Sequence, residues 1–273
     1  MDIVHNLADR VPQDAETVVG ADGLLHCSRC GGARQARISL LDVERIVPCV
    51  CPCLEKKRTD EDEQQRRMEW ALQLEQMRTE GFPERETRGF TFEADDGALP
   101  QITEAMRLYC DGFLEFKKDG KGLLLYGSVG TGKTFYAGCV VNELIERGYP
   151  CLLTSVTRIV TQLSGKAEGK QDFLDGLTRY SLVALDDLGV ERDTEFVNET
   201  LSVVVDALYR GKIPMIITCN LSPAQIAKDG DGRRQRTFDR ILERCHPIKI
   251  DGVSRRKQAG RDSYAEMKKL LGV

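Results

Sequence analysis

Short apolar runs alternate with amphipathic segments from about residue 98 to the end of the chain. Five of these runs have the length and composition of buried strands: 123–126, 150–154, 182–185, 215–219 and 247–250. Between the first two runs, apolar residues of the segment 135–147 recur at helical spacing, and Gly148 follows as a residue suited to a left-handed helix cap. Strands that alternate with helices predict an α/β fold, with a five-stranded parallel sheet between two layers of helices.

The first hundred residues follow a different pattern. Five cysteines precede residue 54, and the segment 54–80 is almost continuously charged, with only an intermittent apolar stripe. This segment is predicted to be a helical connector that ends at Gly81-Phe82-Pro83, because proline cannot continue a helix. The chain is therefore expected to comprise a small cysteine-rich module over 1–55, a charged helical linker and lead-in over 56–97, and an α/β domain over 98–273.

Composition narrows the class of protein. With 41% hydrophobic and 30% charged residues, and no run approaching the roughly 18 apolar residues of a membrane span, the chain is expected to be globular, without a membrane partner. Its first residues lack the basic start and apolar stretch of a secretory signal, so we expect it in the reducing cytoplasm, with its ten cysteines as thiols or metal ligands. A net charge of −4 argues against indiscriminate coating of nucleic acid but leaves room for a local basic groove.

The segment 127–134 fits the phosphate-binding pattern GxxxxGK[ST] and lies between the first expected strand and its helix. The residues expected to bind ATP are those of the loop itself: Gly127, Ser128, Val129, Gly130, Thr131, Gly132, Lys133 and Thr134. Glycines let the backbone aim its N–H groups at phosphate oxygens, Lys133 would bind the β- and γ-phosphates, and the Thr134 hydroxyl would ligate Mg²⁺. The alternative, an ordinary glycine-rich turn, is disfavoured because strand, loop and helix agree.

Acidic and polar residues end two further strands. Asp186 and Asp187 follow the buried run 182–185, where an unpaired buried charge would be costly without a ligand. Asp186 is expected to bind ATP-associated Mg²⁺, and Asp187 to polarise the attacking water as a catalytic carboxylate. Asn220 follows the run 215–219 and is our candidate for a polar residue that reports on the γ-phosphate, although asparagine is also a common turn residue.

The segment 122–273 resembles the AAA+ ATPases of the DnaC/DnaI/IstB group, in which the motif YGxxGxGKT precedes the motif DDLG. Here these motifs are residues 126–134 and 186–189. Residues 238–241 and 252–256 resemble the DRI/DRL and GxSxR segments of the same family. The resemblance implies that residues 98–273 form an AAA+ P-loop ATPase domain that hydrolyses ATP.

The same resemblance assigns two further arginines to the site. Arg240 would be the catalytic arginine finger and Arg256 a sensor arginine, with Arg244, one helical turn after Arg240, as a rival for the finger. A finger reaches the ATP of an adjacent subunit, so the resemblance also implies self-association into a ring or spiral.

The lead-in to the domain carries a resemblance of its own. The segment 81–87, followed by Phe90-Thr91-Phe92, resembles the lead-in of phage-type DnaC-like proteins. In AAA+ proteins this lead-in lies near the adenine, so Phe90 and Phe92 are candidates to pack there. Packing in the core is the expectation for both.

Cysteines of the N-terminal module have the spacing of metal ligands. Cys27 and Cys30, with Cys51 and Cys53, would close a tetrahedral Zn²⁺ site with two thiolates from each of two segments. Cys49 is an alternative ligand, and the resemblance to a PxxCxC pattern in DnaC-like proteins favours Cys51 and Cys53. A small module with few large apolar groups would need a structural metal, although free thiols are the alternative. The other cysteines are expected in the core: Cys110, Cys139, Cys151, Cys219 and Cys245.

Taken as a family member, the chain would be an ATP-dependent loader of a DnaB-type replicative DNA helicase that binds ATP and single-stranded DNA during replication initiation. The resemblance implies that residues 1 to about 80 bind the helicase, with Lys166 and Lys170 as candidate DNA contacts. An IstB-like transposition helper ATPase is the alternative, and the cysteine module disfavours it because that group usually lacks one. A third possibility is a regulatory adaptor that binds ATP without appreciable turnover.

Overall fold

The computed structural model describes residues 17–40, 43–164, 169–189, 194–228, 232–255, 263–264 and 267–271 of the 273-residue chain. The chain divides into two compact units, Met1–Leu72 and Gln73–Val273. Within the described residues, no helix is both long and apolar enough to cross a lipid bilayer.

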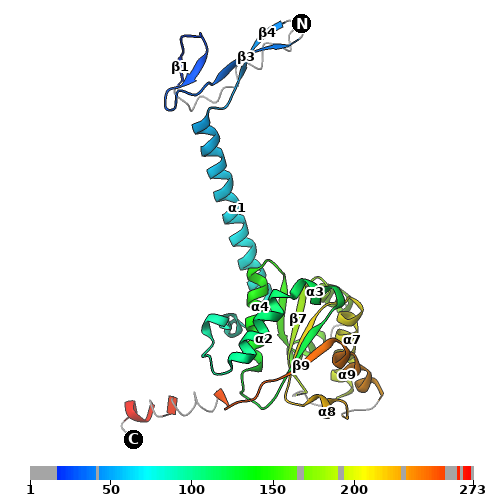
Figure 1. The fold of residues 1–273 in the computed structure, drawn as a ribbon. Helices are drawn as coiled ribbons and strands as arrows, with labels where there is room; N and C mark the ends of the chain where they lie inside the picture. The colour runs from blue at the N-terminus through cyan, green and yellow to red at the C-terminus, as the bar shows by residue number, and fades with distance from the viewer. Residues whose placement is uncertain are drawn as a thin grey trace. The chain divides into compact units, whose positions relative to one another are not determined.

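The first unit contains two short hairpins and the start of a long helix (Figure 1). β1 (Thr17–Val19) pairs with β2 (Leu25–Cys27), and β3 (Gln35–Leu40) pairs with β4 (Val43–Pro48), both antiparallel. These hairpins were not predicted, because strands of three to six residues that mix apolar and polar side chains have no clear apolar run.

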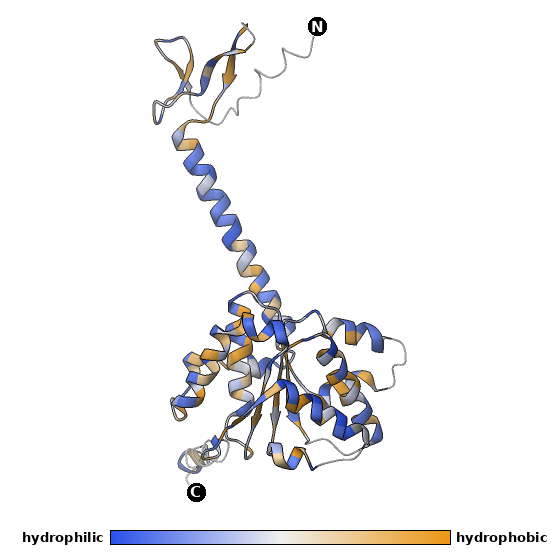
Figure 2. Cartoon of the chain, turned by 45° about the vertical axis from the view of Figure 1, so that its right-hand side comes forward, coloured by the Kyte–Doolittle hydropathy of each residue, from blue (hydrophilic) through white to orange (hydrophobic). Residues whose placement is uncertain are grey.

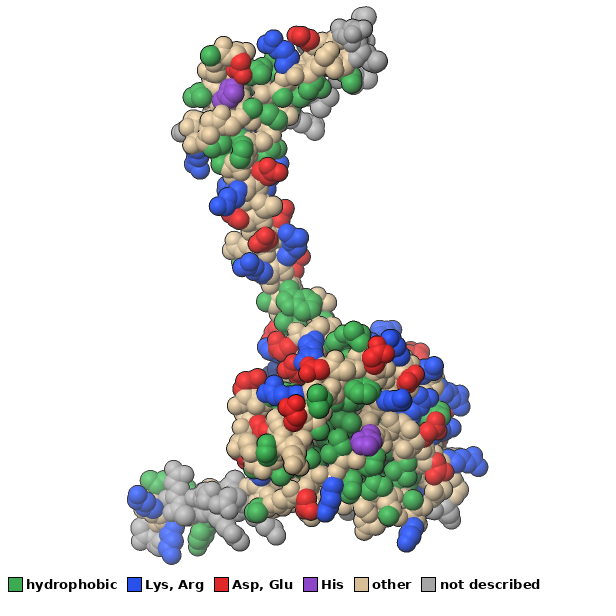
Figure 3. All heavy atoms as spheres, viewed as in Figure 1, with side chains coloured by type: hydrophobic (Ala, Val, Ile, Leu, Met, Phe, Trp, Pro, Cys, Tyr) green, Lys and Arg blue, Asp and Glu red, His purple; other side chains and the backbone are tan. Residues whose placement is uncertain are grey.

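The charged helix predicted over 54–80 is found as α1 (Pro52–Gly81), which begins in the first unit and ends in the second. Hydrophilic residues surround most of this helix (Figure 2). Acidic and basic side chains alternate on its surface (Figure 3), with pairs such as Lys57–Glu61 and Arg67–Glu63 one turn apart. The helix ends at Gly81, two residues before the proline that was expected to stop it.

The second unit is built on a five-stranded parallel sheet in the order β6-β7-β8-β5-β9. Its strands are β5 (Gly122–Tyr126), β6 (Cys151–Ser155), β7 (Leu182–Leu188), β8 (Met215–Cys219) and β9 (Cys245–Lys249). All five predicted strands are therefore confirmed, together with their parallel arrangement. β7 continues beyond residue 185 through a bulge, which carries Asp186 and Asp187 at its end.

Helices cover both faces of this sheet. One face packs against α2 (Pro100–Asp111), α3 (Phe113–Asp119), α4 (Lys133–Glu146) and the 3₁₀ turn η2 (Phe92–Ala94). A second 3₁₀ turn, η1 (Arg85–Gly89), contacts α4. The other face packs against α5 (Val156–Leu163), α6 (Lys170–Leu177), α7 (Glu195–Arg210), α8 (Pro223–Ile226) and α9 (Gly232–Arg244). Figure 1 shows α2 and α4 on one side of β7, and α7 and α9 on the other.

Alternation along β5 explains the two cores. Leu123 and Leu125 contribute to one hydrophobic cluster and Leu124 to the other, because successive strand residues face opposite sides of a sheet. The predicted three-layer α/β arrangement is thus confirmed. The five cysteines expected in the core are all buried there: Cys110, Cys139, Cys151, Cys219 and Cys245.

Candidate nucleotide and metal sites

The phosphate-binding loop joins β5 to α4 at the carboxyl edge of the sheet, between β8 and β9. Gly130 and Gly132 have φ values of 84° and 103°, a region that favours glycine. A side chain at Gly130 would also collide with the Ser254 hydroxyl. The loop can therefore keep this shape only with glycine, and it ends at the open amino terminus of α4.

Lys133 lies inside this loop. Its side chain is 6% exposed, and its ammonium group donates hydrogen bonds to the carbonyl oxygens of Gly127 at 3.0 Å and Ser128 at 2.9 Å. The Thr131 hydroxyl donates to the same Ser128 oxygen at 3.0 Å. A buried cation beside a row of backbone amides at a helix amino terminus is suited to an anion with several oxygens, such as a polyphosphate.

A pocket of about 470 Å³ opens beside the loop. It gathers residues from five parts of the second unit: Phe90, Val129, Gly130, Gly132, Lys133, Thr134, Phe135, Asp187, Asn220 and Arg255. The structure therefore brings the loop together with Asp187 from the end of β7 and Asn220 from the end of β8, as the positions of these residues in the sequence suggest.

Asp186 lies next to this pocket in a network of hydroxyl groups. Thr134 Oγ1 donates to both carboxylate oxygens, at 2.9 and 3.1 Å, and Thr218 Oγ1 donates to Oδ1 at 2.6 Å. Thr218 accepts in turn from the Asp187 amide at 2.9 Å. A carboxylate and a hydroxyl in contact are hard oxygen ligands, so Thr134 and Asp186 fit the requirements of Mg²⁺. Thr218 was not predicted, because nothing in a buried strand distinguishes it from an ordinary core threonine.

The pKa of Asp186 is raised, mainly because the carboxylate is buried, and the nearby charge of Asp187 adds to this increase. Hydrogen bonds from Thr218 and Thr134 lower the pKa, but they do not outweigh burial. The charged form of this carboxylate is therefore disfavoured by its surroundings. A bound divalent cation would reverse that balance, because it favours the charged form.

Asp187 adopts an unusual backbone conformation, with a φ of 58° within the bulge in β7. Residues other than glycine rarely adopt positive φ values, and those that do are often found at functional sites. The conformation accompanies a change of direction after Asp186, and Asp187 lines the pocket while Asp186 stays bound to the two threonines.

Replacing Asp186 by asparagine is expected to raise the melting temperature while abolishing ATP hydrolysis. The pKa of Asp186 is raised on folding, so the folded chain binds the carboxyl proton more tightly than the unfolded chain does. The free energy of unfolding therefore falls as the pH rises through the folded pKa and the carboxylate becomes charged. The neutral amide avoids that cost, and a gain of about 1 kcal/mol corresponds to roughly 2–4 °C for a domain of this size. The gain should be present at pH 7 and shrink toward acidic pH.

Asp251→Asn is the matched control for this measurement. Asp251 is exposed, and its side-chain hydrogen bond with Lys249 lowers its pKa, so its removal should not raise the melting temperature. Thermal unfolding of both variants at several pH values, without nucleotide, would show the difference. If Asp186→Asn were no more stable than the wild type at pH 7, the charged form of Asp186 would not be destabilising the fold.

The two candidate finger arginines lie on α9, outside this pocket. Arg240 Nη1 lies 2.8 Å from an oxygen of Asp206, and its guanidinium group lies 5.6 Å from the centre of the Tyr209 ring. Arg244 lies 4.5 Å from the same ring and donates to the carbonyl oxygen of Asp119. Both arginines therefore pack on α7 within their own chain.

Three other candidate contact residues were named from the sequence. Arg256 and Lys166 lie outside the described residues, and Lys170 begins α6, with its ammonium group 3.9 Å from Glu199.

Two residues of the pocket wall were expected elsewhere or not noticed. Phe90, for which core packing was the expectation, lines the pocket with its ring 5.5 Å from that of Phe135, whereas Phe92 is buried beneath Arg107. Arg255 also lines the pocket, and it is the neighbour of the arginine that the GxSxR pattern selected. The GxSxR pattern selects Arg256 by spacing alone, and spacing cannot show which of the adjacent Arg255 and Arg256 side chains faces the pocket.

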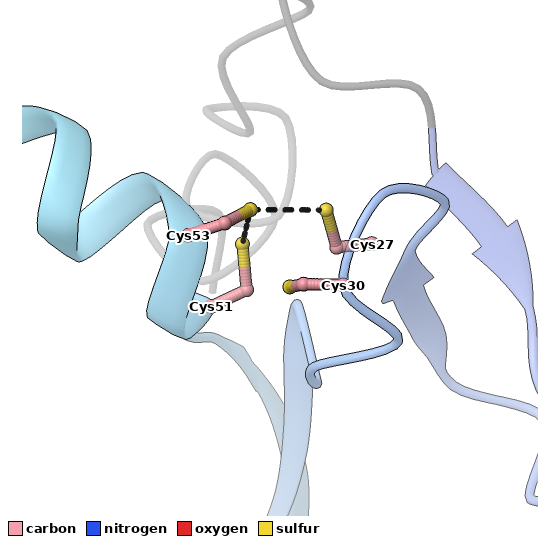
Figure 4. Close-up of side chains that lie close together, drawn as sticks. All are labelled: Cys27, Cys30, Cys51 and Cys53. Carbon is pink, nitrogen blue, oxygen red and sulfur yellow. Dashed lines mark hydrogen bonds between the residues drawn. The ribbon is translucent and has the colours of Figure 1, made fainter.

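Four cysteines of the first unit form a separate cluster (Figure 4). Cys27 and Cys30 come from the end of β2 and the loop after it, Cys51 immediately precedes α1, and Cys53 lies in its first turn. All four sulfur atoms lie within 4.8 Å of one another, with Cys53 Sγ at 3.5 Å from Cys27 and 3.4 Å from Cys51. Sulfur atoms in a tetrahedral zinc site lie about 3.8 Å apart, given Zn–S bonds of about 2.3 Å, so the four thiols fit Zn²⁺.

Cys49 lies apart from this cluster, with its thiol 3.3 Å from the carbonyl oxygen of Ala33. Within the cluster, burial acts to raise the pKa of Cys51, but the Leu54 amide, the Cys53 thiol and Arg34 outweigh it and lower the pKa to about 6. Hydrogen bonds with Cys30 and Cys51 raise the pKa of Cys53 to about 12. Thiolates this close repel one another, so full deprotonation of the four requires a cation.

The chain is similar to known ATP-binding proteins. The sequence pattern of the family described as IstB-like ATP binding protein matches residues 53–263. The replicative helicase loader DnaI of Bacillus subtilis (strain 168) is 27% identical over 219 residues, which are 75% of this chain and 67% of that protein. The replicative helicase loader DnaC of Escherichia coli (strain K12) is 26% identical over 139 residues, which are 49% of this chain and 54% of that protein.

A solved structure shares the fold. The crystal structure of the DnaC helicase loader superposes with a TM-score of 0.53 and 22% identity, covering 61% of this chain and 99% of that chain. At this level of identity the likeness concerns the fold alone.

Proposed function

This chain belongs to the IstB-like ATP-binding protein family, and from that premise we propose that it is an ATP-dependent loader of a replicative DNA helicase. Matches to two proteins named replicative helicase loaders support this proposal. The activity, the helicase and single-stranded DNA as partners, and a cytoplasmic location all belong to the proposal, because the match to DnaC spans about half of that protein.

In the proposed reaction the polar residues in and beside the pocket have distinct roles. The amides of the phosphate-binding loop and the Lys133 ammonium group bind the phosphate chain, and Thr134 with Asp186 holds Mg²⁺. At that position Mg²⁺ would supply positive charge against the charge that develops on the phosphates. Asp187 accepts a proton from the attacking water, and Asn220 contacts the γ-phosphate from the end of β8.

Self-association into a ring or spiral is part of the same proposal. Of the two candidate fingers we favour Arg240, because its side chain keeps 30% of its surface exposed and its only described ion pair is with Asp206. Arg244 is held by a backbone carbonyl as well as by the Tyr209 ring. An arginine finger must reach the ATP of an adjacent subunit, so we favour Arg240, which has no described hydrogen bond to a backbone carbonyl.

The observation that favours a helicase loader over a transposition helper is the cysteine cluster. The family match begins at residue 53, so three of the four clustered cysteines precede the part shared with the IstB-like family. The sequence resemblance places a PxxCxC pattern in DnaC-like proteins, whereas the IstB group usually lacks a cysteine module. We propose that the cysteine-containing unit provides that surface and that zinc stabilises it.

Apolar side chains on the β3–β4 hairpin support this assignment. Leu40 pairs with Val43 across the hairpin, Ile38 lies on the same face, and these three are 62%, 52% and 41% exposed. Apolar groups clustered on a surface are characteristic of protein interfaces. We propose that this hairpin face contacts the helicase.

Copurification tests the proposed partner. The replicative helicase of the same cell is expected to copurify with the full chain, and Leu40→Glu should reduce the amount recovered by about tenfold, since a charge would be buried in an apolar contact. Leu72→Glu on α1, at a residue 72% exposed, is the control that should leave recovery unchanged. Recovery of a transposase instead of the helicase would favour the transposition helper.

A further inference from the structure

Arg255 is placed against the phosphate-binding loop by its own backbone. Its amide donates to the carbonyl oxygen of Gly130 at 2.9 Å, and five residues earlier the Ile250 amide donates to Tyr126 at 2.8 Å. A methyl group built on Gly132 would lie 3.6 Å from the guanidinium carbon of Arg255. The segment 250–255 therefore lies along the loop, and the Arg255 side chain reaches the pocket at the amino terminus of α4.

Two aspartates of the lead-in bind this arginine. Arg255 Nη2 lies 2.8 Å from Asp96 Oδ1 and 3.7 Å from Asp95 Oδ1. The guanidinium group also lies over the rings of Phe135 and Tyr136, at 5.5 and 5.8 Å from their centres. A cation held between carboxylates and two aromatic faces has a restricted orientation.

Asp95 is itself anchored from two sides. Its side chain is 5% exposed, and it accepts hydrogen bonds from the Thr103 hydroxyl on α2 and from the Tyr136 hydroxyl on α4 at 3.4 Å. α4 is the helix that begins at Lys133. Contacts therefore run in a closed path from the phosphate-binding loop through Tyr136 and Asp95 to Arg255, and back to the loop at Gly130.

Neither aspartate is among the residues that line the pocket, whereas Arg255 is. We propose that Asp95 and Asp96 are positioning residues that hold Arg255, and with it the segment 250–255, over the phosphate-binding loop, so that ATP binding and closure of this segment are coupled. This inference rests on the proposed nucleotide site. Coupling of this kind is reciprocal: ATP should restrain the segment, and loss of the restraint should weaken ATP binding.

The test compares the wild type with Asp95→Asn/Asp96→Asn, with Arg255→Ala and with the triple variant that combines them. Binding of a fluorescent ATP analogue with Mg²⁺ gives the affinity, and amide hydrogen exchange over 250–255 gives the restraint. Each of the first two variants should weaken binding by about tenfold, as expected for one charge-assisted contact. Because the aspartates act through Arg255, the triple variant should bind no more weakly than Arg255→Ala alone.

Hydrogen exchange supplies the second readout. ATP should slow exchange over 250–255 in the wild type and lose most of that effect in all three variants. Asp251→Asn is the matched control, because it removes an ion pair of the same segment, with Lys249, without touching Arg255. Arg255→Lys should recover part of the affinity, since an ammonium group keeps the charge but lacks the planar fork that binds two carboxylates.

Asp95 is buried, so the double variant is checked by thermal unfolding. Should it fail to fold, Asp96→Asn alone replaces it, because Asp96 is 55% exposed and leaves the contacts of Asp95 in place. Unchanged affinity and unchanged exchange, or a triple variant with the sum of the separate losses, would overturn the inference. Lys133→Ala distinguishes this outcome from failure of the nucleotide site: tight ATP binding by that variant would refute the site itself.

Discussion

Replacement of Lys133 by alanine is expected to weaken ATP binding by at least about 100-fold, and to bring ATP hydrolysis to the level of a blank. The ammonium group is almost fully buried inside the phosphate-binding loop, where its described partners are backbone carbonyls of the loop. A phosphate chain in the pocket would replace these neutral acceptors with charged ones. Equilibrium binding of a fluorescent ATP analogue and phosphate release would measure both effects.

Lys121→Ala is the control for this substitution. It removes a lysine of the same unit whose side chain is 63% exposed and lies 3.4 Å from Asp119, so it should leave both quantities unchanged. Thermal unfolding would establish that Lys133→Ala is folded, because the lysine also tethers the loop. A folded Lys133→Ala protein that binds ATP as tightly as the wild type would show that the pocket is not the nucleotide site.

Replacement of Cys27 by serine is expected to release zinc and unfold the N-terminal unit. Among the described residues of 17–72, the buried hydrophobic residues are Cys27 and Cys51, which are themselves members of the cluster. Such a unit has almost no apolar core, and a structural zinc contributes about 10–16 kcal/mol in modules of this size. We expect about one zinc per chain in the wild type and close to none in the variant, by metal analysis of the purified protein.

Cys49→Ser gives the matched comparison, because Cys49 belongs to the same segment but contacts the Ala33 carbonyl instead of the cluster. It should retain zinc and the resistance of the unit to proteolysis. A metal-free wild-type chain whose N-terminal unit resists proteolysis would rule out zinc as its stabilising element. Loss of zinc from Cys49→Ser together with retention in Cys53→Ser would instead assign Cys49 as the ligand.

The sheet and the phosphate-binding loop could be predicted because local sequence determines them. A buried parallel strand is a continuous apolar run, and the glycines of the loop are required by its own backbone angles. Asp186 and Asp187 were recognisable because charges rarely end such a run without a ligand. The bulge that directs the two side chains differently, and Thr218 beneath them, depend on pairing between β7 and β8.

The contacts of Arg255 could not be predicted, because its partner Asp96 lies 159 residues away in the sequence. No spacing rule connects a lead-in aspartate to an arginine near the end of the chain, and each alone has the pattern of a surface charge. The four hairpin strands of the first unit were missed for a related reason. Their side chains have few neighbours to bury them, so the alternation that identifies a strand is weak.

Loading of the cell's replicative helicase onto closed circular single-stranded DNA tests the central claim most directly. We expect the full chain with ATP and Mg²⁺ to increase the amount of helicase bound to the circles, and Lys133→Ala not to increase it. Equal loading by the wild type and Lys133→Ala, or no increase with the wild type while the helicase itself is active on linear DNA, would contradict the proposal that this chain is an ATP-dependent helicase loader.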